Sequence, residues 1–200
     1  PLGRVCGVLS PACPRKFVTH PIGMHIMSQA DVYSLPARIL HWAMALLLFS
    51  LLLAGLAMVQ SLQTWHLTLL TAHKSFGVLA LLLAVIRLAV RLTHTPPALP
   101  TSLPAAQKHA AHATQVLLYV AMFAMPLTGL LMQGAAGRPV NVLGLFTVPA
   151  LLPVDLRAYG LLRELHGWGA WGLIALVLLH VTAALHHGLI KRDKVLRSML

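Results

Sequence analysis

Charged side chains are scarce in this chain, and acidic ones are the scarcest. Charged residues make up 10% of the 200 residues, against 58% that are hydrophobic. A water-soluble domain carries about 25% charged residues. The length would suit one or two soluble domains, but the long apolar runs favour a single all-α, four-helix bundle that is integral to a membrane. The only carboxylates are Asp31, Asp155, Glu164 and Asp193.

Cysteine is equally scarce, with only Cys6 and Cys13, both near the N-terminus. They lie outside every apolar segment. Neither belongs to a Cys-x-x-Cys-His motif, so covalent attachment of a haem is excluded. We expect no structural disulfide.

The N-terminal region lacks an apolar run long enough for the core of a signal peptide. Four prolines within its first 21 residues interrupt any helical or strand periodicity. We therefore predict that residues 1–33 form a disordered extension. Residues 1–26 could also arise from a misplaced start, because Met24 or Met27 could be the true first residue. Without a cleavable signal, membrane insertion would depend on the first apolar helix.

Four apolar segments are each long enough to cross the bilayer core as a helix. They are residues 36–60, 67–92, 106–132 and 159–190. A proline-rich connection separates the second from the third. The segment between the third and the fourth, residues 134–157, is broken by glycine and proline and is too short to span. We expect it to be a loop that lies at the interface or caps the bundle, within one membrane domain over residues 34–200.

The net charge of +11 could indicate a nucleic-acid partner. The basic residues do not form a stripe, however; they gather at the ends of the spans, which is typical of membrane topology signals, and we expect no nucleic-acid partner. One side has Arg38, Arg87, Arg91, Lys108, Lys191, Arg192, Lys194 and Arg197, and the other has Lys74, Arg138, Arg157 and Arg163. Because the richer side faces the cytoplasm, both chain termini are predicted to be cytoplasmic.

Histidines inside the spans are the main functional signal, because an ionisable side chain in a membrane is costly. His166 and His180 lie 14 residues apart on the fourth span, which corresponds to about 21 Å and nearly four whole turns of helix. His41 lies near the start of the first span, and His73 lies near the start of the second, which runs the opposite way. By depth, His73 therefore matches His166 and His41 matches His180. Two stacked pairs of imidazoles are what two b-type haems require, and six-coordinate iron of this kind transfers one electron at a time.

Histidines within a membrane can also have roles that involve no haem. A single histidine can simply form a hydrogen bond between helices. A zinc or copper site would favour ligands at one depth together with carboxylate or thiolate, and the spans offer none suitably placed. His66, His94, His109 and His112 are expected to be loop or interface residues. His186 and His187, one to two turns beyond His180, could replace a ligand or line a quinone or proton site.

Cations are needed for the propionates of a haem, and four basic residues are placed to serve. Each of them could equally be an interface anchor. The candidates are Arg38, Lys74, Arg87 and Arg163.

Several short motifs together resemble the bacterial cytochrome b561 family of four-helix, di-haem membrane cytochromes. The resemblance runs in order from about Ser34 to Leu200. It rests on Ile39–Trp42, Ala72–Gly77, Val85–Leu92, Thr95–Pro97, Ala124–Gly129, Leu165–Gly167, Leu179–Val181 and the pair His186–His187. It implies two non-covalent b haems with the axial ligands His41, His73, His166 and His180. It also implies electron exchange with ubiquinone in the bacterial inner membrane, and some members of the family resemble superoxide oxidases.

Three functions follow from this interpretation. The first is a multi-pass cytochrome that passes single electrons to or from membrane quinone, as in a superoxide:ubiquinone oxidoreductase. Periplasmic cations could then steer superoxide to its site. The second is an anchor subunit that relays electrons from a separate dehydrogenase or hydrogenase, and the third is a histidine-rich transporter without haem.

Overall fold

The structure is a computed structural model of the chain, and it describes residues 32–60, 63–94, 97 and 103–200. Both cysteines and almost all of the expected N-terminal extension lie outside these ranges. So does most of the proline-rich connection between the second and third spans.

Four long helices make up most of the described chain. They are α1 (Leu35–Gln60), α2 (His66–Thr93), α3 (Ala105–Ala135) and α4 (Leu156–Leu185), and α4 continues as the π-helix η2 (His186–Lys191). Each is long and apolar enough to cross a membrane. The predicted four-helix membrane bundle is confirmed.

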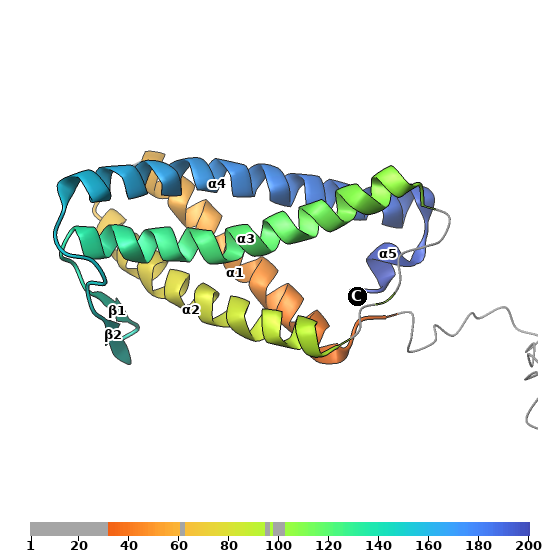
Figure 1. Ribbon diagram of the computed structural model, residues 1–200, viewed down its shortest axis with the longest axis horizontal. Coiled ribbons are helices and arrows are strands. Elements are labelled where there is room, and N and C mark those ends of the chain that lie inside the picture. Colours follow the sequence, from red (N-terminus) through yellow and green to blue (C-terminus); the bar gives the residue numbers. More distant parts are fainter. Residues whose placement is uncertain (1–31, 61–62, 95–96, 98–102) are drawn as a thin grey trace, which may run out of the picture.

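The four helices run along one long axis (Figure 1). α3 and α4 lie side by side, α2 lies along the other flank of α3, and α1 crosses behind them at an angle. A small core cluster of Met44, Ala84 and Met122 joins α1, α2 and α3. Many large apolar side chains point outward instead, as contact with lipid requires; Leu46, for example, is 73% exposed.

A two-stranded hairpin lies at the end of the bundle where α3 ends and α4 begins, and we call this the hairpin end (Figure 1). Its strands are β1 (Val140–Val142) and β2 (Phe146–Val148), which pair antiparallel. The sequence pattern predicts only a loop here. Val140 and Val142 alternate with exposed Asn141 and bury their side chains against Val78 of α2, so packing favours a strand. Between the strands, the left-handed backbone of Gly144 (φ 77°) makes the tight turn possible.

The fourth helix begins at Leu156, earlier than the expected residue 159. Asp155 is its N-cap: one carboxylate oxygen accepts hydrogen bonds from the N–H groups of Arg157 and Ala158, at 2.8 and 3.1 Å. These bonds satisfy donors that the first turn would otherwise leave free.

At the opposite end of the bundle the chain folds back as the short helix α5 (Lys194–Arg197), and we call this the α5 end. The segment after α5 docks on the start of the first helix. The N–H of Tyr33 donates to the carbonyl of Ser198, and the indole Nε1 of Trp42 donates to the carbonyl of Met199, both at 3.0 Å. These two hydrogen bonds hold the C-terminal segment against the start of α1.

Candidate functional site

The four histidines predicted by depth come together as two pairs. At the hairpin end, the rings of His73 (α2) and His166 (α4) have centroids 6.4 Å apart. At the α5 end, the rings of His41 (α1) and His180 (α4) have centroids 6.1 Å apart. All four side chains are partly buried between helices. The long fourth helix thus contributes one imidazole to each site.

The spacing within each pair fits two imidazoles that share one metal ion. Two ring nitrogens that each lie about 2 Å from the same ion leave their ring centres about 6 Å apart. Over the described residues, no three side chains of His, Cys, Asp or Glu come together as a protein-only metal site would require. The pairs therefore suit an ion whose remaining ligands come from another molecule, as the porphyrin of a haem supplies them.

One histidine of the hairpin-end pair lies beside a hydrogen-bond acceptor that favours one tautomer. The hydroxyl of Thr128 donates to the carbonyl of Met125 at 2.9 Å, so its oxygen is free to accept from Nδ1 of His166, 3.1 Å away. With the proton on Nδ1, Nε2 keeps its lone pair for a metal. Nδ1 of His73 is buried near the Leu51 carbonyl, in a position that makes no regular hydrogen bond.

Glycines let neighbouring helices approach this pair closely. A Cβ on Gly55 of α1 would lie 3.8 Å from Cε1 of His73, and one on Gly129 of α3 would lie 3.3 Å from Cε1 of His166. Gly77 faces open space and lines a cavity of about 70 Å³ beside both imidazoles. Lys74 and Gln133 line the same cavity. The sequence motifs include Thr128 and Gly129, but nothing in their spacing predicts contact with His166.

The α5-end pair has a cation in direct contact. Nη2 of Arg87 lies 3.0 Å from Nδ1 of His41. A guanidinium only donates, so this Nδ1 accepts, and the neutral ring carries its proton on Nε2. Nε2 of His41 can therefore bind a metal only after a change that His166 does not need. Either Nε2 loses its proton, or Arg87 turns away to an anion such as a carboxylate, so that Nδ1 can carry the proton instead.

Unpaired buried donors also lie near the α5 end. Nε of Arg38, Nη1 of Arg91 and the hydroxyl of Ser34 are buried and have no hydrogen-bond partner among the described residues. The guanidinium of Arg91 lies 6.0 Å from the ring centroid of Tyr33, which precedes Ser34. Buried donors of this kind suit anionic oxygens such as haem propionates. Sequence reasoning selected Arg38 but missed Arg91 and Ser34.

The other two predicted cations lie toward the hairpin end. Lys74 is partly buried at the small cavity, whereas Arg163 is exposed on α4, one turn before His166. Of the two histidines beyond His180, His186 is exposed and His187 is partly buried. Nδ1 of His187 lies 2.5 Å from Oδ2 of Asp193. The remaining candidates are peripheral: His109 and His112 are exposed on α3, and Nδ1 of His94 lies 3.1 Å from the carbonyl of Val90.

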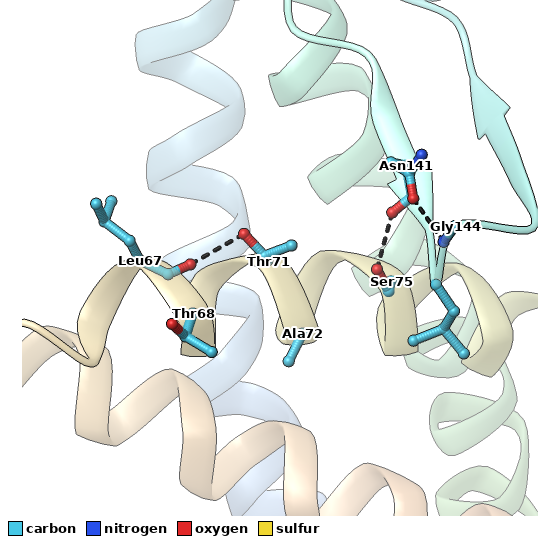
Figure 2. Close-up of a pocket in the computed structure, with 8 residues that line it drawn as sticks. Leu67, Thr68, Thr71, Ala72, Ser75, Asn141 and Gly144 are labelled. Carbon is cyan, nitrogen blue, oxygen red and sulfur yellow. Dashed lines mark hydrogen bonds between the residues drawn. The ribbon is translucent and has the colours of Figure 1, made fainter.

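A larger cavity, of about 560 Å³, lies between the start of α2 and the hairpin (Figure 2). Two of the hydroxyls that line it are used within the protein: Thr71 donates to the Leu67 carbonyl at 2.9 Å and Ser75 to the Asn141 carbonyl at 2.8 Å. None of its lining residues is charged, and it contains neither histidine pair. We therefore assign it no part in the redox site.

Known proteins resemble this chain along most of its length. The family model of the prokaryotic cytochrome b561 matches residues 32–200, which include all four long helices and both histidine pairs. The chain is 31% identical over 179 residues to cytochrome b561 homolog 2 of Escherichia coli (strain K12), covering 88% of this chain and 95% of that protein. It is 27% identical over 136 residues to cytochrome b561 homolog 1 of the same organism, covering 68% of this chain and 76% of that protein.

Proposed function

Because the chain belongs to the prokaryotic cytochrome b561 family, we propose that it holds two b haems, one between His73 and His166 and one between His41 and His180. The chain is a multi-pass b-type cytochrome of the bacterial inner membrane and acts in electron transfer. The observation that carries the two-haem proposal is the spacing of the rings, 6.4 Å in one pair and 6.1 Å in the other. Iron held between two imidazoles has no open position for oxygen and supplies one-electron chemistry.

The surrounding residues would orient the ligands and neutralise the propionates. Thr128 fixes His166 with its Nε2 free, and Gly129 gives that ring room. At the α5 end, Arg38 and Arg91 have buried donors in need of an acceptor. Arg87 can leave His41 for a carboxylate, which frees His41 to bind through Nε2.

We further propose that single electrons pass from superoxide in the periplasm to ubiquinone in the membrane. In this orientation the hairpin end faces the periplasm and both termini face the cytoplasm. Exposed Arg138, Arg157 and Arg163 lie at or near the hairpin end and would attract a small anion, and Lys74 lines the cavity beside both imidazoles. Asp155, which lies among them, uses one carboxylate oxygen to cap α4.

Ubiquinone is proposed to react at the α5 end. The π-helix there carries His186 and His187 just beyond His180, and these two side chains are the candidates for its polar contacts and proton supply. The neutral, apolar quinone can reach this point through the bilayer.

Two measurements on the purified protein test the proposal. Haem analysis with a reduced-minus-oxidised spectrum should give two b haems per chain; one haem or none would contradict the di-haem assignment. Stopped-flow mixing with superoxide should reduce the protein, and ubiquinone should speed its reoxidation. If the protein reacted only together with a co-purifying dehydrogenase or hydrogenase, the anchor-subunit function would replace superoxide oxidation.

A further inference from the structure

One carboxylate is fixed at the point where the fourth helix leaves the membrane. Oδ2 of Asp193 lies 2.5 Å from Nδ1 of His187, and Oδ1 accepts from the N–H of Val195 at 3.0 Å. The backbone N–H of Asp193 donates to the carbonyl of His187 at 3.1 Å. Left-handed Arg192 (φ 51°) reverses the chain so that these groups meet. One oxygen thus caps α5 while the other forms a hydrogen bond with the imidazole.

His187 lies on the helix face that carries His180. Seven residues separate them, which is close to two whole turns and about 10 Å along the axis. Its side chain is 16% exposed, whereas that of the neighbouring His186 is exposed. The π-helix that begins here is a rare conformation, often found at functional sites. His187 is therefore the one of the two histidines whose side chain lies toward the interior of the bundle, on the side of His180.

We propose that His187 delivers protons to the quinone and that Asp193 is its positioning residue. This inference rests on the proposed reduction of quinone at the α5 end. Reduction of a quinone to a quinol takes two electrons and two protons. For each proton, the Nε2–H bond of protonated His187 breaks as an O–H bond forms at a quinone oxygen. The two proposed haems would supply the electrons, and His187 would regain its proton from cytoplasmic water.

Asp193 makes this role possible in two ways. Because its carboxylate accepts from Nδ1, the neutral ring holds its proton there and leaves Nε2 free to exchange protons with the substrate. The negative charge also lies directly beside the ring that passes on the proton, among otherwise basic neighbours. Lys191 lies on the same π-helix and is tied to α3 through a 3.0 Å hydrogen bond to Gln107, and the ring of His186 is 6.0 Å from that of His187. Within the described residues, Asp193 is the only acidic side chain at the α5 end.

The charge state of Asp193 agrees with this role. Its burial acts to raise the pKa. Hydrogen bonds from His187 and from the Val195 N–H outweigh that effect, with a further contribution from the nearby positive charges, so the pKa of Asp193 lies below its ordinary value. The carboxylate is therefore ionised at neutral pH.

His187 and Asp193 could instead serve only to hold α5 in place. The substitution Asp193→Asn distinguishes this structural role from proton delivery. Asparagine is as good an N-cap as aspartate, so α5 keeps its cap. The charge is lost, and an amide N–H facing Nδ1 would force the proton of His187 onto Nε2. The matched variants are His187→Gln, which removes the proton donor, and His112→Gln, which changes an exposed histidine of α3 outside the proposed site.

The experiment compares two oxidants of the chemically reduced, haem-loaded protein. Oxidation by ubiquinone needs protons, whereas oxidation by ferricyanide does not. We expect D193N and H187Q each to slow the ubiquinone reaction about 100-fold, as general acid catalysis allows, and the double variant to be no slower than either. The ferricyanide rates and haem spectra of D193N and H187Q should match those of the wild type, and H112Q should match the wild type with both oxidants. The wild-type ubiquinone reaction should also show a solvent deuterium isotope effect that H187Q lacks.

Three results would overturn the inference. Unchanged ubiquinone rates in D193N and H187Q, in a protein that does reduce ubiquinone, would reject the proton role and leave the proposed function standing. Equal slowing with both oxidants would show that His187 and Asp193 only hold α5 in place. A wild-type protein inert to ubiquinone would overturn both the inference and the proposed quinone reaction.

Discussion

Arg87 on α2 holds His41 on α1 through a hydrogen bond of 3.0 Å between Nη2 and Nδ1. The other end of the guanidinium lies 3.5 Å from the carbonyl of Ala37, and the ring centroid of Tyr119 is 5.9 Å from its central carbon. The corresponding contact in the other pair is a neutral hydroxyl, Thr128, beside His166. The two proposed haem sites therefore differ by one positive charge, which Arg87 would keep close to the α5-end haem whether it contacts His41 or a propionate.

This difference predicts unequal reduction potentials. A nearby cation favours the reduced iron, so Arg87→Gln should lower the midpoint potential of one haem by on the order of tens of millivolts and leave the other unchanged. A potentiometric titration of the purified protein followed at the haem bands measures both. Arg157→Gln, an exposed arginine at the hairpin end, is the matched control. A rise in potential, or equal shifts at both haems, would contradict the arrangement.

The two pairs should also be separable by mutation. His166→Ala is expected to remove only the haem at the hairpin end, and His41→Ala only the haem at the α5 end. Each variant should retain one haem per chain, measured by haem extraction and difference spectra, and the two spectra should sum to that of the wild type. His112→Ala, on the exposed face of α3, should keep both haems. Loss of the same spectral component from both variants would refute the pairing.

The sequence predicts the helices and the pairing depth well because both depend on local properties. Apolar length sets each span, and 14 residues of helix set the separation of His166 and His180 regardless of how the helices pack. The hairpin is not predicted, since three-residue strands carry little local signal. They form because Val140 and Val142 are buried against α2.

Side-chain contacts depend on the rotation and tilt of each helix, which a single sequence does not encode in any regular pattern. The sequence predicts Arg87 as a partner for a propionate, but its contact with His41 requires the observed approach of α1 to α2. It identifies Asp193 only as an acid outside the spans. The contact of Asp193 with His187 requires a left-handed backbone at Arg192, a conformation that arginine rarely adopts.

The room beside His166 predicts a steric effect. A Cβ on Gly129 would already lie 3.3 Å from the ring, so the larger side chain of Gly129→Val should displace the imidazole and lower occupancy of one haem by half or more. Gly160→Val carries a similar helix-propensity cost on an exposed face with nothing within 4 Å, and should leave both haems bound. Haem-to-protein ratios provide the measurement, and equal losses in the two variants would count against the close contact.

The attachment of the hairpin to α2 can be tested through Ser75, which is 2% exposed and donates to the Asn141 carbonyl at 2.8 Å. Ser75→Ala should lower the free energy of unfolding by about 1 kcal/mol and speed amide exchange in residues 140–148. Thr71→Ala is the control, because that hydroxyl bonds only within its own helix and is exposed. Unchanged exchange in the hairpin of Ser75→Ala would show that the valine contacts suffice.

The docking of α5 should weaken at low pH, when Asp193 becomes protonated. Burial acts to raise the pKa of Asp193, but hydrogen bonds from His187 and Val195 hold it below the ordinary 3.8. The folded state therefore binds this proton less readily than the unfolded state, and the stabilisation is complete above 3.8 and is lost as pH falls below that value. Amide exchange of residues 194–199 should accelerate in that range, and Asp193→Asn should remove the transition. Exchange that accelerates equally in both proteins would assign the acid response to another group.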